Sequence, residues 1–413
     1  MTTPSEDRPV ADLPNSKLKK DGVENVKWPH LLIMFPQFYQ NHLEKQLKPA
    51  EYQTLQSLVY LLQSHRQVSI ELLASVMPYP IQFESRRRSL QRFLNSDCLN
   101  IKSLWFPLIK EILKAKFKKS KPLKLVIDRT QWRAHNVFML SLVWEKRSIP
   151  LYWRLLDKRG CSNICEQQAL ITPVLELLSD YEVIVLGDRE FGSVKLASWL
   201  SSMDVKFIIR VKQGRYILEE NSDYIRLSDL GLLPGTSFYL SDVKITKQKG
   251  FRTFDIAGYW RRKYRGKEEE EGWYLLTNVG NFQQAIDSFK SRSGIEAMFK
   301  DCKTGGYNLE RSHANDRRLS SLILLIAIAY SCAVIQGQKI KTMGIQKYVG
   351  RLTEYGRSIR RHSSFWIGLY GKAWVVGMEF CQDIITELMR IRRNKLPFFQ
   401  RGMRAMSFIL SMF

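Results

Sequence analysis

The stretch Leu123–Trp132, LKLVIDRTQW, sets the fold, because its β-branched apolar run predicts a buried strand that ends in Asp128. Two further apolar runs, NVFMLSLVWE and IPLYWRLL, follow after short connections, which predicts three consecutive antiparallel strands. A fourth run, EVIVLGDREF at 182–191, again places an aspartate, Asp188, directly after the apolar residues. An aspartate at a strand end is often a turn former or a helix cap, so neither residue identifies a site alone.

Helical patterns alternate with these strands. Amphipathic helices are expected at 165–179 and 195–202, and VKFIIRVK at 205–212 is expected to be a fifth strand. This alternation predicts an α/β fold, with a sheet covered by helices on both faces. The first and fourth strands should lie side by side, with Asp128 and Asp188 at their carboxyl ends, where open sheets bind their ligands.

A third carboxylate comes from the stretch Phe289–Lys303, FKSRSGIEAMFKDCK. At about 100° per residue, the side chains of Phe289, Arg292, Glu296 and Lys303 fall within roughly 60° of one another on a helix, so they would form one ridge. The alternative for this window alone is a solvated helix face with an Arg292–Glu296 pair.

Three carboxylates brought together would repel one another unless cations separate them. Two Mg²⁺ or Mn²⁺ ions held by Asp128, Asp188 and Glu296 could activate a water or a 3′-hydroxyl for in-line phosphoryl displacement. The chain has 64 Lys and Arg against 40 Asp and Glu, a net charge of +24, which points to nucleic acid or an anionic membrane as partner. Together these features predict a metal-dependent nuclease or DNA strand transferase.

The rest of the chain divides into six expected segments. Residues 1–28 are expected to be a disordered tail and 29–115 a helical DNA-binding region, followed by the core at 116–212 and 281–345. A β-rich insertion at 213–280 would interrupt the core, and a basic helical region at 346–413 would close the chain. The apolar segment Leu319–Val334 is expected to be a buried core helix rather than a membrane span.

Basic side chains cluster in two places away from the carboxylates. Arg86 and Arg87 lie on a predicted basic helix that follows a shorter helix, an order typical of a helix-turn-helix DNA reader, although a solvated face is equally consistent. Arg261 and Arg262 lie in the insertion, where they would either be solvated or clamp phosphates. The six cysteines lack disulfide or zinc spacing, which predicts a reduced, cytoplasmic protein without structural zinc.

The motifs VIDRT at Asp128, LGDREF at Asp188, WYLLT at Trp273 and F-x2-R-x3-E-x6-K ending at Lys303 resemble those of the DDE transposases of bacterial insertion sequences, in the IS-four group. The group's signature begins with tyrosine, so Phe289 departs from it by one hydroxyl. The similarity extends over about residues 121–334.

The resemblance implies a ribonuclease-H-like core in which Asp128, Asp188 and Glu296 bind two metal ions. Arg292 and Lys303 would grip DNA phosphates, and Trp273 would stack on a flipped base if excision passes through a hairpin; its alternative role is a core anchor. Arg189 and Glu190 are supporting candidates beside Asp188.

The predicted function is that of a nucleoid-associated, cut-and-paste DNA transposase that acts as a homodimer on terminal inverted repeats. Two alternatives remain open from the sequence: a nuclease without strand transfer, and a DNA-binding protein that has lost catalysis.

Overall fold

The computed structural model describes residues 35–132, 134–218, 223–245, 253–262, 271–303, 305–356 and 361–412. The predicted tail at 1–28 and most of the charged KEEEEG stretch lie outside the described residues. The described part begins with a helical region that contains α1 (Gln37–Gln46), α2 (Pro49–His65), α3 (Ile70–Val76), α4 (Phe83–Leu94), the π-helical turn η1 (Ile101–Trp105) and α5 (Phe106–Lys116).

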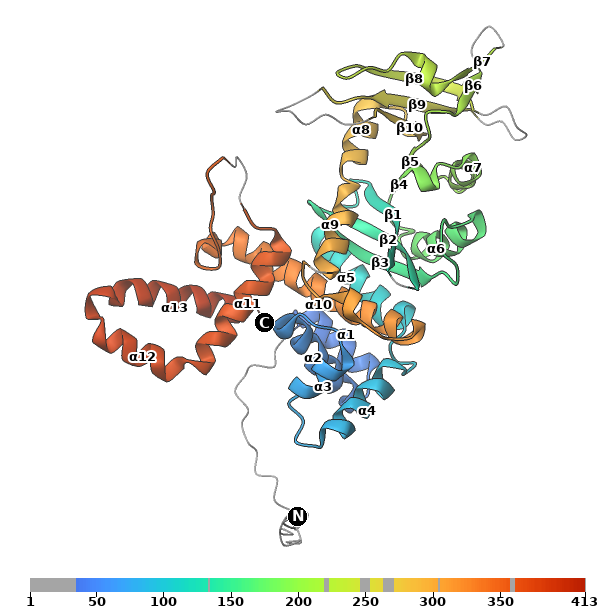
Figure 1. Ribbon diagram of the computed structural model, residues 1–413. Helices are drawn as coiled ribbons and strands as arrows, with labels where there is room; N and C mark the ends of the chain where they lie inside the picture. The colour runs from blue at the N-terminus through green and yellow to red at the C-terminus, as the bar shows by residue number, and fades with distance from the viewer. Residues whose placement is uncertain are drawn as a thin grey trace, which may run out of the picture. The chain divides into compact units, whose positions relative to one another are not determined.

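The centre of the fold is a mixed sheet of eight strands in the order β3-β2-β1-β4-β5-β10-β9-β8 (Figure 1). Its first part comprises β1 (Leu123–Trp132), β2 (His135–Trp144), β3 (Arg147–Leu155), α6 (Ile164–Leu177), β4 (Val183–Gly187), α7 (Val194–Ser202) and β5 (Lys206–Arg210). Strand β4 runs parallel to β1 on one side and to β5 on the other. The other neighbouring strands of this sheet are antiparallel. The predicted three antiparallel strands and the pairing of the first strand with the fourth are confirmed.

The predicted insertion contributes its strands to this same sheet. It contains β6 (Tyr216–Leu218), β7 (Tyr224–Arg226), β8 (Ser237–Lys244), β9 (Thr253–Tyr259) and β10 (Trp273–Thr277). Strand β10 pairs with β5, and β9 and β8 extend the sheet beyond it, whereas β6 and β7 form a separate two-stranded sheet. The β-rich character is therefore confirmed, and the sheet continues from the core into the insertion.

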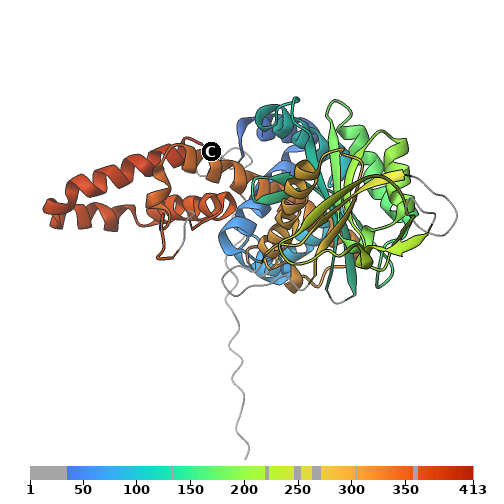
Figure 2. The same ribbon diagram turned by 90° about the horizontal axis from the view of Figure 1, so that it is seen from above.

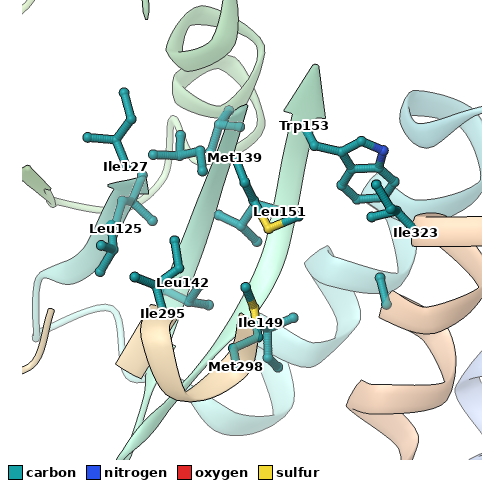
Figure 3. Packing of buried hydrophobic residues seen from close by; sticks show 14 of the residues in the cluster. Leu125, Ile127, Met139, Leu142, Ile149, Leu151, Trp153, Ile295, Met298 and Ile323 are labelled. Atoms are coloured by element: carbon teal, nitrogen blue, oxygen red, sulfur yellow. The ribbon is translucent and has the colours of Figure 1, made fainter. Parts of the chain in front are cut away.

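Helices cover both faces of the sheet, as predicted for this α/β fold class, and helical regions stand at both ends of the described chain (Figure 2). After β10 come α8 (Phe282–Lys290), α9 (Ser293–Cys302), α10 (Asp316–Thr342), α11 (Ser364–Phe380), α12 (Gln382–Ile391) and α13 (Leu396–Leu410). Ile295 and Met298 of α9 are fully buried and belong to the same apolar core as the side chains of β1–β3 (Figure 3).

Strand alternation determines which side chains meet which helices. Asp128 pairs with Met139 of β2, and the next residue, Arg129, pairs with Phe138. Because successive side chains point to opposite faces, Asp128 and Met139 share one face, and Arg129 and Phe138 share the other. Met139 borders a small cavity together with residues of α9 and α10, which identifies the Asp128 face as the one that these helices cover.

Helix α10 is the core helix that was predicted at Leu319–Val334, although at 27 residues it is longer than that segment. By length and composition it could cross a membrane, yet 94% of its most apolar window is buried inside the protein. Tyr39 of α1 hydrogen-bonds Ser331, Gln63 of α2 donates to the Ala329 carbonyl, and Trp153 of β3 donates to Ser320. Helix α10 therefore joins the N-terminal helices to the sheet.

Candidate active site

Asp128 and Asp188 are neighbours at the point where strand pairing ends. The parallel register of β1 with β4 runs up to Ile127 and Gly187, and the next residue of each chain segment is the aspartate. One carboxylate oxygen of each aspartate accepts a hydrogen bond from the following backbone N–H, at 2.7 Å for Arg129 and 2.6 Å for Arg189. Asp188 lies at the carboxyl end of β4, as predicted. The prediction that the first strand ends in Asp128 is wrong, because β1 continues to Trp132 along β2, and only its pairing with β4 stops before Asp128.

The helix expected over Phe289–Lys303 is two helices, and this corrects the single-ridge prediction. Helix α8 ends at Lys290 and α9 begins at Ser293, so Phe289 lies on α8, while Arg292 and Lys303 flank α9. The Ser291 hydroxyl donates to the Ser288 carbonyl at the joint, a local hydrogen bond that competes with continued helix. Only Glu296 of the four ridge residues lies within α9.

Gly294 lies in the first turn of α9, close to the sheet. A Cβ atom at this position would lie 2.9 Å from the backbone carbonyl oxygen of Arg147, at the start of β3. Glycine therefore permits the first turn of α9 to contact the sheet directly, in spite of its poor helix propensity. This contact helps to place Glu296, two residues further along, beside the aspartates.

Arg292 lies between the carboxylates. Its Nη2 donates to Glu296 Oε1 at 2.5 Å, and its Nη1 is 3.8 Å from Asp128 Oδ2. The Arg292 side chain is 17% exposed and that of Asp128 is 21% exposed, whereas that of Glu296 is 56% exposed. A guanidinium therefore bridges two of the three predicted ligands.

The pKa of Asp128 is raised from its ordinary value of 3.8 to about 6. Burial is the largest cause, and the negative charges of Asp188 and Glu296 raise the pKa further. The Arg129 N–H and the Arg292 guanidinium lower the pKa, but not enough to compensate. The three carboxylates are thus electrostatic neighbours, and the net rise in the pKa of Asp128 comes chiefly from its burial.

This donor set fits a hard divalent cation, because carboxylate oxygens are the preferred ligands of Mg²⁺ and Mn²⁺. The geometry is not that of a closed ligand sphere: in the part of the chain that the structure describes, no three His, Cys, Asp or Glu side chains form a group that could hold a metal ion. Asp128 and Asp188 lie together, and Glu296 is paired with Arg292.

Three charged residues at this site were not predicted from the sequence. Arg210, the last residue of β5, has its pKa lowered chiefly by burial, and its charged neighbours include Glu271, Asp188 and Arg292. Glu271 accepts from both Arg189 and Arg210, at 2.5 and 2.8 Å. Arg210 could have been found by the same strand-end rule as Asp188. Glu271 belongs to the charged stretch KEEEEG of the sequence, where no pattern distinguishes it. The third residue, Arg129, is paired with Glu190 (2.9 Å).

A groove of about 900 Å³ lies beside Asp188. Most of its lining residues follow β4 or β5, whereas Cys161 precedes α6 and Glu271 precedes β10. The lining residues are Cys161, Arg189, Glu190, Gly192, Ser193, Lys212, Gln213, Gly214, Arg215 and Glu271. Three of these residues carry positive charge, so the groove offers cations next to the carboxylates.

Phe289 and Trp273 form one aromatic contact. Their ring centroids are 5.1 Å apart at an interplanar angle of 67°, and Trp273 also packs against Tyr259. Phe289 is buried and Trp273 is half-buried. Trp273 therefore anchors its strand to α8, and the base-stacking role predicted for it remains a prediction.

The other predicted DNA contacts are separated from the carboxylates or engaged within the protein. Lys303 forms an ion pair of 3.0 Å with Glu310. Arg86 donates to the carbonyls of Ala74 and Ile81 and thereby joins α3 to α4, which are connected by six residues (77–82), more than the three or four of a typical helix-turn-helix. Arg87 pairs with Glu71 and Glu84.

In the insertion, Arg261 and Arg262 are exposed. DNA binding by these residues stays a prediction.

Residues 119–332 match the family described as Transposase DDE domain. Among solved structures, the chain is similar to a piggyBac transposase in a synaptic complex with hairpin DNA, at 12% sequence identity and a TM-score of 0.41, over 84% of this chain and 78% of that one. No protein of curated function matches.

The family match spans more than half of the chain, and it includes Asp128 of β1, Asp188 directly after β4, and Glu296 of α9. The chain therefore belongs to the family of transposases with a DDE domain.

Proposed function

We propose that this protein is a cut-and-paste DNA transposase of an insertion sequence in the IS-four group. The observation that carries the proposal is the clustering of three carboxylates: Asp128 and Asp188 directly follow the last paired residues of β1 and β4, and Arg292 bridges Asp128 and Glu296. A charge cluster of this kind is unfavourable in a protein that has no use for it, because burial and like charges both disfavour the ionised carboxylates.

Asp128 and Asp188 would hold the divalent ions, with Glu296 as a third oxygen donor. Bound Mg²⁺ or Mn²⁺ would supply Lewis-acid stabilisation of the phosphoryl group and a more acidic nucleophile. Arg292 would hold Glu296 in place beside Asp128 and offer a positive charge to the DNA phosphate. Lys303 would contact phosphate from the far end of α9, and Phe289 would support Trp273.

DNA is the proposed partner, in the form of terminal inverted repeats and target. The net charge of +24 favours a polyanion, and Arg189, Lys212 and Arg215 place positive charge in the groove next to Asp188. Action as a homodimer and a cytoplasmic, nucleoid-associated location belong to the same proposal. Arg86, Arg87, Arg261 and Arg262 are proposed contacts to DNA outside the catalytic centre.

The test is a joining assay with Mg²⁺, linear DNA that carries the presumptive terminal repeats, and a supercoiled target plasmid. Repeat ends joined to the target through their 3′-hydroxyls would support a transposase. Cleavage without joined products would indicate a nuclease, and DNA binding without cleavage would indicate a catalytically inactive protein.

A hairpin route is tested on the same substrate by denaturing electrophoresis of the excised ends. If Trp273 stacks on a flipped base, Trp273→Ala should reduce hairpin formation more than first-strand nicking, because base stacking contributes about 1–3 kcal/mol. Equal loss of both steps would indicate that Trp273 serves only to anchor β10.

A further inference from the structure

The residues that follow the two aspartates are joined to each other. Arg129, directly after Asp128, donates from Nε and Nη2 to the two carboxylate oxygens of Glu190, two residues after Asp188. These distances are both 2.9 Å, and the side chains are 17% and 19% exposed. This paired, partly buried geometry is the strongest form of the arginine–carboxylate interaction.

This ion pair lies just beyond the point where the backbone pairing of β1 with β4 stops. The register of β1 with β4 ends at Ile127 and Gly187, and β4 gives way to a single 3₁₀ turn, η2 (Arg189–Phe191). No ladder hydrogen bond between these strands therefore fixes the spacing of Asp128 and Asp188, which come directly after the last pair. The Arg129–Glu190 pair connects the two chain segments just beyond that point.

A second contact fixes the same turn to the sheet. Phe191, which follows Glu190, stacks on Phe138 with ring centroids 5.8 Å apart and an interplanar angle of 10°. Phe138 is the cross-strand partner of Arg129. The turn after Asp188 is therefore held by one polar and one aromatic contact to neighbouring positions of β1 and β2.

The loop before α6 completes this arrangement. The backbone N–H of Ser162 donates to Glu190 Oε1 at 3.3 Å, and Arg129 Nη1 lies 3.3 Å from Asn136 Oδ1. The Asn136 amide in turn donates to the carbonyls of Lys158 and Gly160. Glu190 and Arg129 thus have further partners that fix their orientation, on the face of the sheet opposite Asp128.

A contribution to folding stability is a weak explanation for the Arg129–Glu190 pair, because the cost of removing partly buried charges from water offsets much of their attraction. We propose that Arg129 and Glu190 are positioning residues that set the spacing of Asp128 and Asp188 for divalent-ion binding. This inference rests on the proposed function, since it concerns the same carboxylates. Neither residue touches the metal or the DNA phosphate in this proposal, and both act through the aspartates.

The test compares Glu190→Gln and Arg129→Gln with the wild-type protein and with the double variant. Mn²⁺ affinity is measured by isothermal titration calorimetry, and cleavage of repeat DNA is measured as a function of Mn²⁺ concentration, well below the melting temperature of every variant. Each single variant should weaken Mn²⁺ binding by about 10- to 100-fold, the range found when groups that orient metal ligands are removed. The double variant should lose little more than either single one, because the two residues act as a unit.

Glu182→Gln supplies the matched control. Glu182 pairs with Lys206 at the opposite end of β4 and β5, at 2.6 Å, so its removal breaks an ion pair between strands without affecting the turn after Asp188. It should leave Mn²⁺ affinity unchanged. Circular dichroism melting of all variants checks that they are folded.

The results separate this inference from the proposed function. If Asp188→Asn abolishes Mn²⁺ binding while Glu190→Gln and Arg129→Gln only lower the melting temperature and keep full Mn²⁺ affinity, the positioning role is refuted and the site stands. If Asp188→Asn keeps wild-type Mn²⁺ affinity, the proposed metal site itself is wrong.

Discussion

Single residues determine the chemistry available where the pairing of β1 with β4 ends. Asp188 occupies the first position after its strand, and one oxygen is already used by the Arg189 N–H. Its second oxygen is the one that can bind a cation. The role of Asp188 can therefore be tested by replacing its charge without changing its shape.

Asp188→Asn should reduce cleavage and strand transfer by about 100-fold or more, because the amide supplies no negative charge to a divalent ion. Affinity for repeat DNA should change little, since the DNA is held by positive side chains elsewhere. Cleavage gels and electrophoretic mobility shifts on the same preparations measure the two quantities. Undiminished cleavage would remove Asp188 from the site.

Asp128 should make stability depend on pH in an unusual direction. Its pKa rises from 3.8 to about 6 on folding, so the folded state binds the proton more tightly than the unfolded state. The ionised carboxylate therefore costs stability above about pH 6, and this cost disappears as the pH falls from 6 towards 4.

Asp128→Asn should then stabilise the metal-free protein at pH 7.5 by up to about 3 kcal/mol, the equivalent of roughly two pKa units, and by much less at pH 4.5. Urea unfolding in the presence of EDTA at both pH values measures this difference. A variant that is less stable than wild type at pH 7.5 would show that the contact with Arg292 outweighs the burial of charge.

At the scale of elements, the break between α8 and α9 is the feature that sequence patterns did not reveal. The spacing of Phe289, Arg292, Glu296 and Lys303 is compatible with one helix, and periodicity alone cannot detect a joint between two helices. The contact between Gly294 and the Arg147 carbonyl is tertiary, so it overrides a local pattern. Gly294 was the sole local signal, as a poor helix residue within the window.

Gly294→Ala tests that contact. Alanine is the better helix former by about 1 kcal/mol, yet its Cβ would lie 2.9 Å from the Arg147 oxygen, so we expect lower thermal stability and lower cleavage activity. Gly377→Ala on α11 is the control, because its Cβ would meet nothing within 4 Å. That substitution should raise stability by about 0.5–1 kcal/mol and leave activity unchanged. A similar gain for both would contradict the close approach at Gly294.

Strands were predicted more reliably than their supporting contacts. The apolar runs around Asp128 and Asp188 are long, β-branched and bounded by polar residues, so their type and pairing follow from local sequence and simple connection rules. Arg129 and Glu271 carry no such signal, and the position of Arg210 at the end of β5 does not reveal its partners. Arg129 pairs with Glu190, and Arg210 pairs with Glu271. The partners of each pair are 61 residues apart in the sequence, so only the folded chain brings them together.

At the scale of the whole molecule, charge governs the encounter with DNA. A net charge of +24 implies that many phosphates are neutralised on binding, with release of their counterions. The affinity for DNA should fall by about 10³-fold or more between 50 and 200 mM salt. Fluorescence anisotropy with a labelled repeat and with an unrelated duplex measures this slope. A flat response for both duplexes would contradict the polyanion prediction.

The continuity of the sheet limits how this protein can be shortened. Strand β5 is paired on one side with β4 and on the other with β10, which arrives from the far end of the inserted segment. A shortened protein that lacks residues 213–280 would leave the backbone donors and acceptors along that side of β5 open to a foreign strand, and it would be prone to aggregate. A minimal version of the enzyme should therefore keep β10, or replace it with a substitute strand.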